Sequence, residues 1–224
     1  MTEIDTREKL VLAAERLFAE KGIDNVSLRE INRAAGQKNV AALHYHFGAR
    51  EALLEAIFEH RMSRINRRRV ALLDGFEANG ATPGIRQMVE AMVLPLAEQL
   101  DGGAKGGNYI RFLAQAISDP GVDIGGLVRD KFDHGMTRTR TLARSLLADK
   151  PPQIVDERMR LVAAHMVHAL ADKARRLASG RHPDRADETA LFISNLIDGI
   201  AGALTAPVSE ETMAMFANTT RKTA

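Results

Sequence analysis

Basic and hydrogen-bonding side chains gather between residues 25 and 50, and they are the side chains of this sequence best suited to binding an anion. The basic residues of that stretch are Arg29, Arg33, Lys38 and Arg50, and its one acidic residue is Glu30. Residues 1–70 hold 13 Lys and Arg against 10 Asp and Glu, whereas the whole chain has a net charge of +2. Such a local excess of positive charge could bind the phosphates of a nucleic acid. It could also be a solvated helix surface, and charge alone favours that simpler interpretation.

Catalytic groups are not evident elsewhere in the sequence. The 224 residues include no cysteine, which excludes disulfides, thiolate metal sites and a cysteine nucleophile. We find no convincing Ser-His-Asp set, no Glu-x-x-His pair and no cluster of metal ligands. His165, His168 and Asp172 share one helical face and could bind a metal or place polar groups in a pocket, but such a histidine pair is more often structural. We therefore predict no enzyme, no cofactor and no metal site.

The basic stretch reads as two short helices joined by a tight turn. Ser27-Leu-Arg-Glu30 forms a capping box for the first helix, which Gly36 ends, and Gly48 ends the second. A helix over residues 6–21 precedes the pair, and a long helix that begins at residue 49 or 50 follows it. This is the pattern of a helix-turn-helix unit, whose second helix enters the major groove of DNA.

Around this unit the sequence resembles the TetR family of bacterial transcription regulators. The strongest motif is Leu43-His-Tyr-His-Phe47 followed by Arg50-Glu-Ala-Leu53, and Leu17-Phe-Ala-Glu-Lys-Gly22 is similar to part of the family's first helix. The resemblance covers about residues 6–60. The sequence departs from the family pattern in its turn, which is one residue longer, and at His44, where a tyrosine often stands.

The resemblance implies two sets of DNA contacts. The residues that would meet base edges are Arg29, Lys38, Asn39 and Ala42. The residues that would meet phosphates are Ser27, His44, Tyr45, His46 and Arg50. His46 could instead only brace the head, and the longer turn leaves the register of the base contacts open by one position. Small residues early in the second helix suit a groove about 12 Å wide.

Apolar periodicity predicts an all-α fold without strands. We expect a three-helix helix-turn-helix head over residues 1–50, a connecting helix that runs to about residue 70, and a larger helical ligand-binding and dimerisation body over residues 71–224. Further helices are expected at residues 124–148, 153–179, 184–206 and 210–217. The later turns of the connecting helix are rich in arginine, which suits the helix dipole better than a second nucleic-acid contact. These arginines are Arg61, Arg64, Arg67, Arg68 and Arg69.

The body offers a mostly apolar lining for the small-molecule effector that the family resemblance implies. The candidate pocket residues are Met88, Met92, Leu96, Phe112, Phe132, Met136, His165 and Met166. Methionine is deformable and suits an adaptable pocket, although ordinary core packing is the simpler interpretation of any one of these residues.

The last two long helices are expected to pair with their copies across a two-fold axis. The candidate interface residues are Leu196, Gly199, Ile200, Ala203 and Leu204. The small residues among them permit close approach of helices. A two-fold dimer presents two reading helices, so the operator should be pseudo-palindromic, with half-sites about 34–36 Å apart or a multiple of that distance.

These patterns predict a sequence-specific DNA-binding transcriptional regulator, and the resemblance favours a repressor that a small apolar ligand releases from a palindromic operator. The expected partners are double-stranded DNA, this effector and a second copy of the chain, with no membrane. No apolar run approaches the ~18 residues of a membrane span, and the N-terminus lacks signal-peptide features, so we expect a cytoplasmic protein. The alternatives are a helical interaction module and a small-molecule-binding bundle without DNA function.

Overall fold

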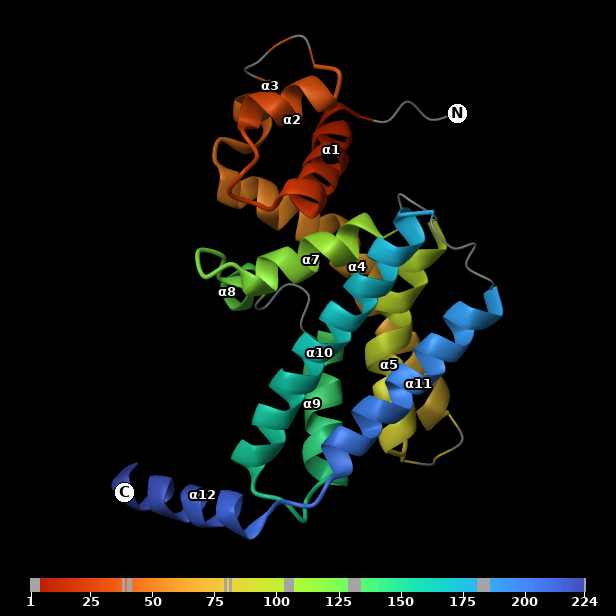
Figure 1. The fold of residues 1–224 in the computed structure, drawn as a ribbon, viewed down its shortest axis with the longest axis vertical. Coiled ribbons are helices and arrows are strands. Elements are labelled where there is room, and N and C mark those ends of the chain that lie inside the picture. The colour runs from red at the N-terminus through yellow and green to blue at the C-terminus, as the bar shows by residue number, and fades with distance from the viewer. Residues whose placement is uncertain are drawn as a thin grey trace.

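The computed structural model describes residues 5–37, 39, 42–78, 80, 82–102, 107–128, 134–180 and 186–223. Within these residues every regular element is a helix, which confirms the predicted all-α fold. A small head of three helices stands on a longer helical body (Figure 1).

The head consists of α1 (Thr6–Lys21), α2 (Leu28–Ala34) and α3 (Ala42–Phe47). Apolar residues recur every three or four positions in α1, so one side of that helix can meet the other two. Leu10, Ile31 and Leu43, one from each helix, are fully buried. Their burial holds the three helices as one packed unit.

The body begins with a long helix that it shares with the head. Its elements are α4 (Arg50–Glu77), α5 (Ile85–Ala97), the 3-10 helix η1 (Glu98–Gly102), α7 (Asn108–Ser118), α8 (Ile124–Val128), α9 (His134–Leu146), α10 (Pro152–Ala178), α11 (Ala186–Thr205) and α12 (Glu210–Thr223). The prediction of a single helix at residues 124–148 is wrong, because α8 and α9 are separate helices. Residues 129–133 between them lie outside the described residues. The last helix also continues beyond the predicted residue 217.

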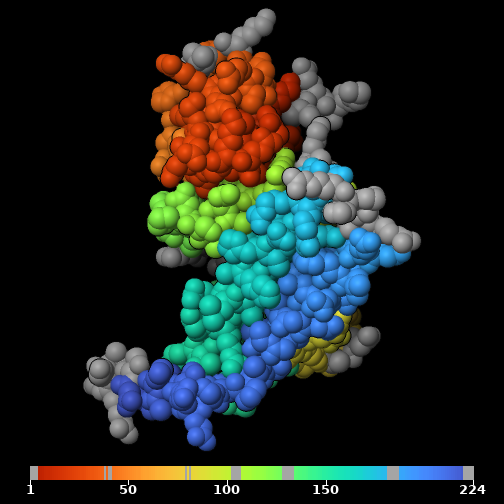
Figure 2. All heavy atoms as spheres, viewed as in Figure 1, coloured from red at the N-terminus to blue at the C-terminus, as the bar shows by residue number. Residues whose placement is uncertain are grey.

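Helix α7 lies between the head and the rest of the body (Figures 1 and 2), and α1 packs against it. The rings of Phe18 in α1 and Phe112 in α7 stack with their centroids 6.1 Å apart. Beside them the Arg61 guanidinium of α4 donates to both carboxylate oxygens of Glu15, at 2.7 and 2.9 Å. Glu15 is only 2% exposed, so this is a buried ion pair that joins α1 to α4.

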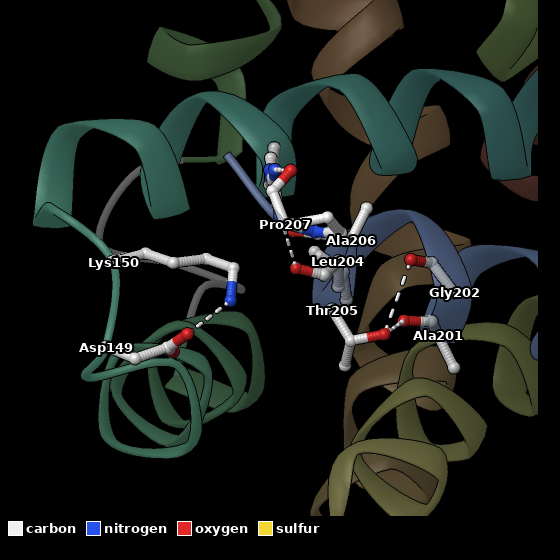
Figure 3. Close-up of polar contacts among 9 residues, drawn as sticks. Asp149, Lys150, Ala201, Gly202, Leu204, Thr205, Ala206 and Pro207 are labelled. Carbon is white, nitrogen blue, oxygen red and sulfur yellow. Dashed lines mark hydrogen bonds and ion pairs between the residues drawn. The ribbon is translucent and has the colours of Figure 1, made fainter. Parts of the chain in front are cut away.

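The end of α11 is held by polar contacts to its backbone. The Thr205 hydroxyl donates to the Ala201 carbonyl at 2.9 Å (Figure 3). Arg158 of α10 donates to the carbonyl oxygens of Leu204 and Pro207, at 2.8 and 3.1 Å. These bonds tie the last turn of α11 to α10, and α12 then projects away from the body (Figure 1).

Among the described residues no single helix is long and apolar enough to cross a membrane. Asp187–Thr205 and Glu210–Asn218 reach that length and apolarity only as a pair, which is bent by 58°.

Candidate functional site

Helices α2 and α3 are held together by a buried polar side chain that sequence reasoning missed. Asn32 of α2 is 2% exposed, and its Oδ1 accepts the backbone N–H of Leu43 at 3.2 Å. Its Nδ2 donates to the Leu28 carbonyl, also at 3.2 Å. One side chain thus satisfies an amide in the first turn of α3 and sets how α3 sits on α2. The available signal was an asparagine next to Ile31 on the inner side of a short helix.

The glycines that follow α2 and α3 have the backbone conformation that the sequence predicted. Gly36 has a φ of +69° and Gly48, after α3, has a φ of +70°, values that side chains rarely adopt. Helix α3 begins at Ala42, whose N–H donates to the Asn39 carbonyl at 3.1 Å. Lys38, a predicted base contact, lies outside the described residues.

Several predicted DNA-contacting side chains are on the surface of the head. Arg29, Asn39, His44 and Tyr45 are exposed, whereas Ala42 and His46 are half-buried. The Tyr45 side chain is 86% exposed, which is high for a large aromatic residue. Its ring lies edge-on to that of His46, with centroids 5.2 Å apart. Tyr45 is thus available to a partner, while His46 also braces the tyrosine.

Two predicted phosphate contacts have structural bonds within the head. The Ser27 hydroxyl accepts the Glu30 amide at 3.2 Å, as an N-cap should. The His44 Nδ1 lies 2.9 Å from the Gly48 carbonyl oxygen, so this nitrogen is engaged at the end of α3. The Ser27 oxygen and the other ring nitrogen of His44 could still face a phosphate, and both contacts stay predictions.

Arg50 is held differently from the way the resemblance implies. Its guanidinium donates to the Ile23 carbonyl and, at 2.7 Å, to the Val26 carbonyl, and it lies over the Phe18 ring at 5.8 Å. The side chain is thus turned inward and braces the link between α1 and α2. Its predicted phosphate contact stays a prediction that this arrangement does not support.

The charge of the α2 surface is more positive than its composition suggests. The carboxylate of Glu30, its one acidic residue, accepts from the Lys21 ammonium at 2.5 Å. This contact with Lys21 lowers the pKa of Glu30, so the carboxylate stays ionised and occupied. Within the described part of the chain neither Arg29 nor Arg33 forms an ion pair, although the charge of Arg33 also helps to lower the pKa of Glu30, so both exposed guanidinium groups can meet an anion.

A second candidate site is a pocket of about 330 Å³ in the body, partly open to solvent, between α4, α5, α7, α9 and α10. Of the predicted pocket residues, Leu96, Met136 and Met166 line it. The lining residues that sequence reasoning missed are Met62, Ile65, Arg69, Leu113, Ile117, Arg160, Ala163, Ala164 and Val167. The pocket is therefore mostly apolar, as expected, but two arginines border it.

Four of the predicted pocket residues lie elsewhere, and Phe132 lies outside the described residues. Met88, Met92 and Phe112 are fully buried in the core and do not line the pocket, because neighbouring helices cover them completely. His165 is exposed, since α10 turns Met166 inward and His165 and His168 toward solvent.

No metal site is formed by the histidines of α10. In the described ranges there is no group of three His, Cys, Asp or Glu side chains that could hold a metal ion. Asp172 instead pairs with Arg175 and Arg176 of its own helix, each at 3.3 Å.

The predicted dimer interface is only partly on the surface. Leu196, Ile200 and Leu204 are buried against the rest of their own subunit, because they form the inner stripe of α11. Gly199 and Ala203 are exposed on its other side. Two large leucines of these last long helices are also exposed, Leu191 of α11 at 71% and Leu161 of α10 at 53%.

A helix-turn-helix head on a separate helical body defines a class of DNA-binding regulators, and comparison with known families specifies it. The family model described as bacterial regulatory proteins, tetR family, matches residues 10–57. A second model, the tetracyclin repressor-like C-terminal domain, matches residues 90–203. The chain belongs to the TetR family of transcriptional regulators, which confirms the resemblance.

Solved structures share this fold at low sequence identity. A chain described as a tetR family transcription regulator from a Shewanella species is 15% identical, with a TM-score of 0.59 over 88% of this chain and 98% of that one. NalD from Pseudomonas aeruginosa, described as the secondary repressor of the MexAB-OprM multidrug efflux pump, is 17% identical, with a TM-score of 0.55 over 87% and 94%. FadR from Bacillus halodurans, a fatty acid degradation regulator, is 15% identical, with a TM-score of 0.55 over 92% and 98%.

Proposed function

We propose that this protein is a dimeric repressor that binds a pseudo-palindromic operator in the cytoplasm and is released by a small, mostly apolar effector. The observation that carries the proposal is the exposed α2–α3 surface, where Arg29, Arg33 and Tyr45 face outward while Lys21 occupies Glu30. The repressor description of NalD agrees with it. We propose no catalytic activity for the chain.

In this proposal the residues of the head divide into two groups. Arg29 meets a base edge from the first turn of α2, and Lys38, Asn39 and Ala42, which precede or begin the reading helix in sequence, meet the others. Tyr45, with Ser27, His44 and His46, meets phosphates, because hydroxyl and imidazole groups donate to phosphate oxygens. Arg50 holds the head in shape, since its guanidinium already donates to two backbone carbonyls.

The dimer forms through the outer surfaces of α10 and α11. Leu161 and Leu191 are exposed large apolar residues there, and Gly199 and Ala203 would let helices approach closely. A two-fold axis along this surface gives each dimer two heads. The dimer itself is tested by sedimentation at micromolar concentration, where a monomer would contradict it.

Effector and head are linked through two helices. Helix α7 gives Leu113 and Ile117 to the pocket, and its Phe112 stacks on Phe18 of the head. Helix α4 gives Met62 to the pocket, and its Arg61 binds Glu15 of the head. An effector that binds better to one spacing of the two heads shifts the protein toward that spacing. A coupling free energy of ~1–3 kcal/mol between effector and DNA then weakens DNA binding by ~5–150-fold.

The test is selection of bound duplexes from a random DNA pool, followed by titration of the selected duplex. We expect a pseudo-palindromic consensus with nanomolar, salt-dependent binding. Arg29→Ala should weaken this binding, whereas Arg144→Ala, which removes the same charge from α9 in the body, should leave it unchanged. Folded dimer that enriches no sequence would instead support an interaction module or a ligand-binding bundle without DNA function.

A further inference from the structure

The effector pocket contains a buried arginine whose hydrogen-bond partners, among the described residues, are all neutral. Arg69 of α4 lines the pocket and is 3% exposed. Its Nε donates to the Ala91 carbonyl at 3.2 Å, and one amino group lies 3.4 Å from the Asn66 Oδ1. Burial lowers the pKa of Arg69 to about 10, which still leaves the guanidinium protonated at neutral pH.

Arg69 differs in this respect from its neighbours in the same helix. Arg61 binds Glu15 at 2.7 Å, and Arg68 binds Glu98 at 2.7 Å. In the part of the chain that the structure describes, Arg69 has no carboxylate partner. A buried charge is stabilised by an opposite charge, so this guanidinium lacks the partner that its surroundings call for.

The position of Arg69 is supported by a close approach of α9. The Gly135 N–H donates to the Asn66 Oδ1 at 3.1 Å, the same oxygen that lies near Arg69. A Cβ at Gly135 would lie 2.4 Å from this oxygen and 3.2 Å from the Arg69 Cδ. Only a glycine thus leaves room for the arrangement that holds the guanidinium beside the pocket.

The other described residues of the lining give an anion no second buried partner. Arg160, the second arginine of the lining, has a side chain that is 67% exposed and pairs with Glu157 at 2.5 Å. The remaining lining side chains are aliphatic or methionine. One buried cation in an apolar pocket of about 330 Å³ matches a molecule with one charged end and an apolar body.

We propose that the effector is an amphiphilic carboxylate, whose apolar body fills the pocket and whose carboxylate binds the Arg69 guanidinium. The inference rests on the proposed effector function of this pocket and names the chemical class of its ligand. The planar guanidinium can donate two parallel hydrogen bonds to a carboxylate, which a lysine could not do. A neutral ligand of the same shape would leave the buried charge without a partner.

The experiment compares decanoate with decan-1-ol on the full-length protein without DNA, by calorimetric titration. The two probes share their alkyl body and differ in the charged group. We expect wild-type protein to bind decanoate about ten- to a hundredfold more tightly than decan-1-ol, as a charge-assisted contact should give. Equal binding of the two probes, or no binding of decanoate at millimolar concentration, would overturn the proposal.

Arg69→Met should abolish the preference, since decanoate loses its partner while decan-1-ol binds at least as well as before. A buried charge replaced by an apolar residue of similar length usually leaves a protein folded, and circular dichroism checks this. Arg67→Gln, an exposed arginine of the same helix, is the matched control and should keep the preference. If Arg69→Met does not fold, Arg69→Lys replaces it and should bind decanoate more weakly than wild type does.

Two further outcomes separate this inference from the proposed function. A decanoate preference in a protein that selects no DNA sequence would leave the carboxylate site standing and remove the repressor function. Operator binding without any preference between the probes would leave the repressor function standing and remove the carboxylate site.

Discussion

The head and the body differ in how directly a residue's type reveals its task. In the head, α2 and α3 are short and lie near each other in sequence, so the residues that face outward follow from helix periodicity and two glycines. In the body, five helices from residues 62–167 meet around one pocket. Residue types there gave the apolar character of the lining but only three of its twelve described members. The exposed residues of the head can therefore be predicted from local sequence, whereas the residues of the pocket depend on long-range packing.

The largest effect is expected at the junction of head and body, where Glu15 of the head pairs with Arg61 of the helix that enters the body. Glu15→Ala leaves a partly buried guanidinium without its carboxylate, so we expect a loss of ~3–5 kcal/mol in the free energy of unfolding. Urea denaturation measures it. The control is Glu20→Ala, whose exposed pair with Arg16 should contribute at most ~1 kcal/mol. Equal losses in both variants would show that the junction is no stronger than a surface contact.

A smaller effect is expected where α2 holds α3. Asn32→Ala removes the acceptor of the buried Leu43 amide, and we expect a loss of ~1–3 kcal/mol in stability together with weaker DNA binding. Thermal unfolding and DNA titration measure the two effects. Asn25→Ala, at an exposed asparagine that bonds the Lys21 carbonyl, serves as the control. DNA binding that survives Asn32→Ala unchanged would show that α3 is positioned by its apolar contacts alone.

Specificity and affinity should separate within the head. Asn39→Ala should relax the sequence preference by ~1–3 kcal/mol at one base pair, because a base contact is lost. Tyr45→Phe should weaken all duplexes alike, because a phosphate carries no sequence information. Titrations on the selected operator and on single-base variants distinguish the two patterns. The same pattern in both variants would refute the proposed division of contacts.

The smallest effects are expected from glycine substitutions, which test how Asn66 holds Arg69 beside the pocket. Gly135→Ala forces Asn66 away from its place near Arg69, so we expect weaker binding of decanoate with DNA affinity unchanged. The control is Gly75→Ala in the exposed part of α4, where a Cβ meets no atom within 4 Å. That variant should be stabilised by ~0.4–1 kcal/mol, because alanine has less freedom than glycine in the unfolded chain. Calorimetry and thermal unfolding test both, and an unaltered pocket in Gly135→Ala would contradict the role of Asn66.

Corrections to the predictions follow from the same physics. Leu196, Ile200 and Leu204 have the spacing of any apolar helix stripe, and spacing does not tell whether that stripe meets its own subunit or a second one. His165 has the same ambiguity, because one position along α10 separates exposed His165 from buried Met166. The phosphate contact of Arg50 stays a prediction, but the carbonyls that its side chain binds were not foreseen, because Ile23 and Val26 are far from Arg50 in sequence.

The sequence alone determined the helical class, the helix-turn-helix head, the family and the outward position of Tyr45, because these depend on contacts within a few turns of the chain. Tertiary structure decided which arginine of α4 is buried, which residues surround the pocket and that Asn32 joins two helices. The five arginines from residue 61 to residue 69 look alike as a charged run. Only the packing of α5, α7, α9 and α10 around that helix removes Arg69 from water and leaves the others at or near the surface.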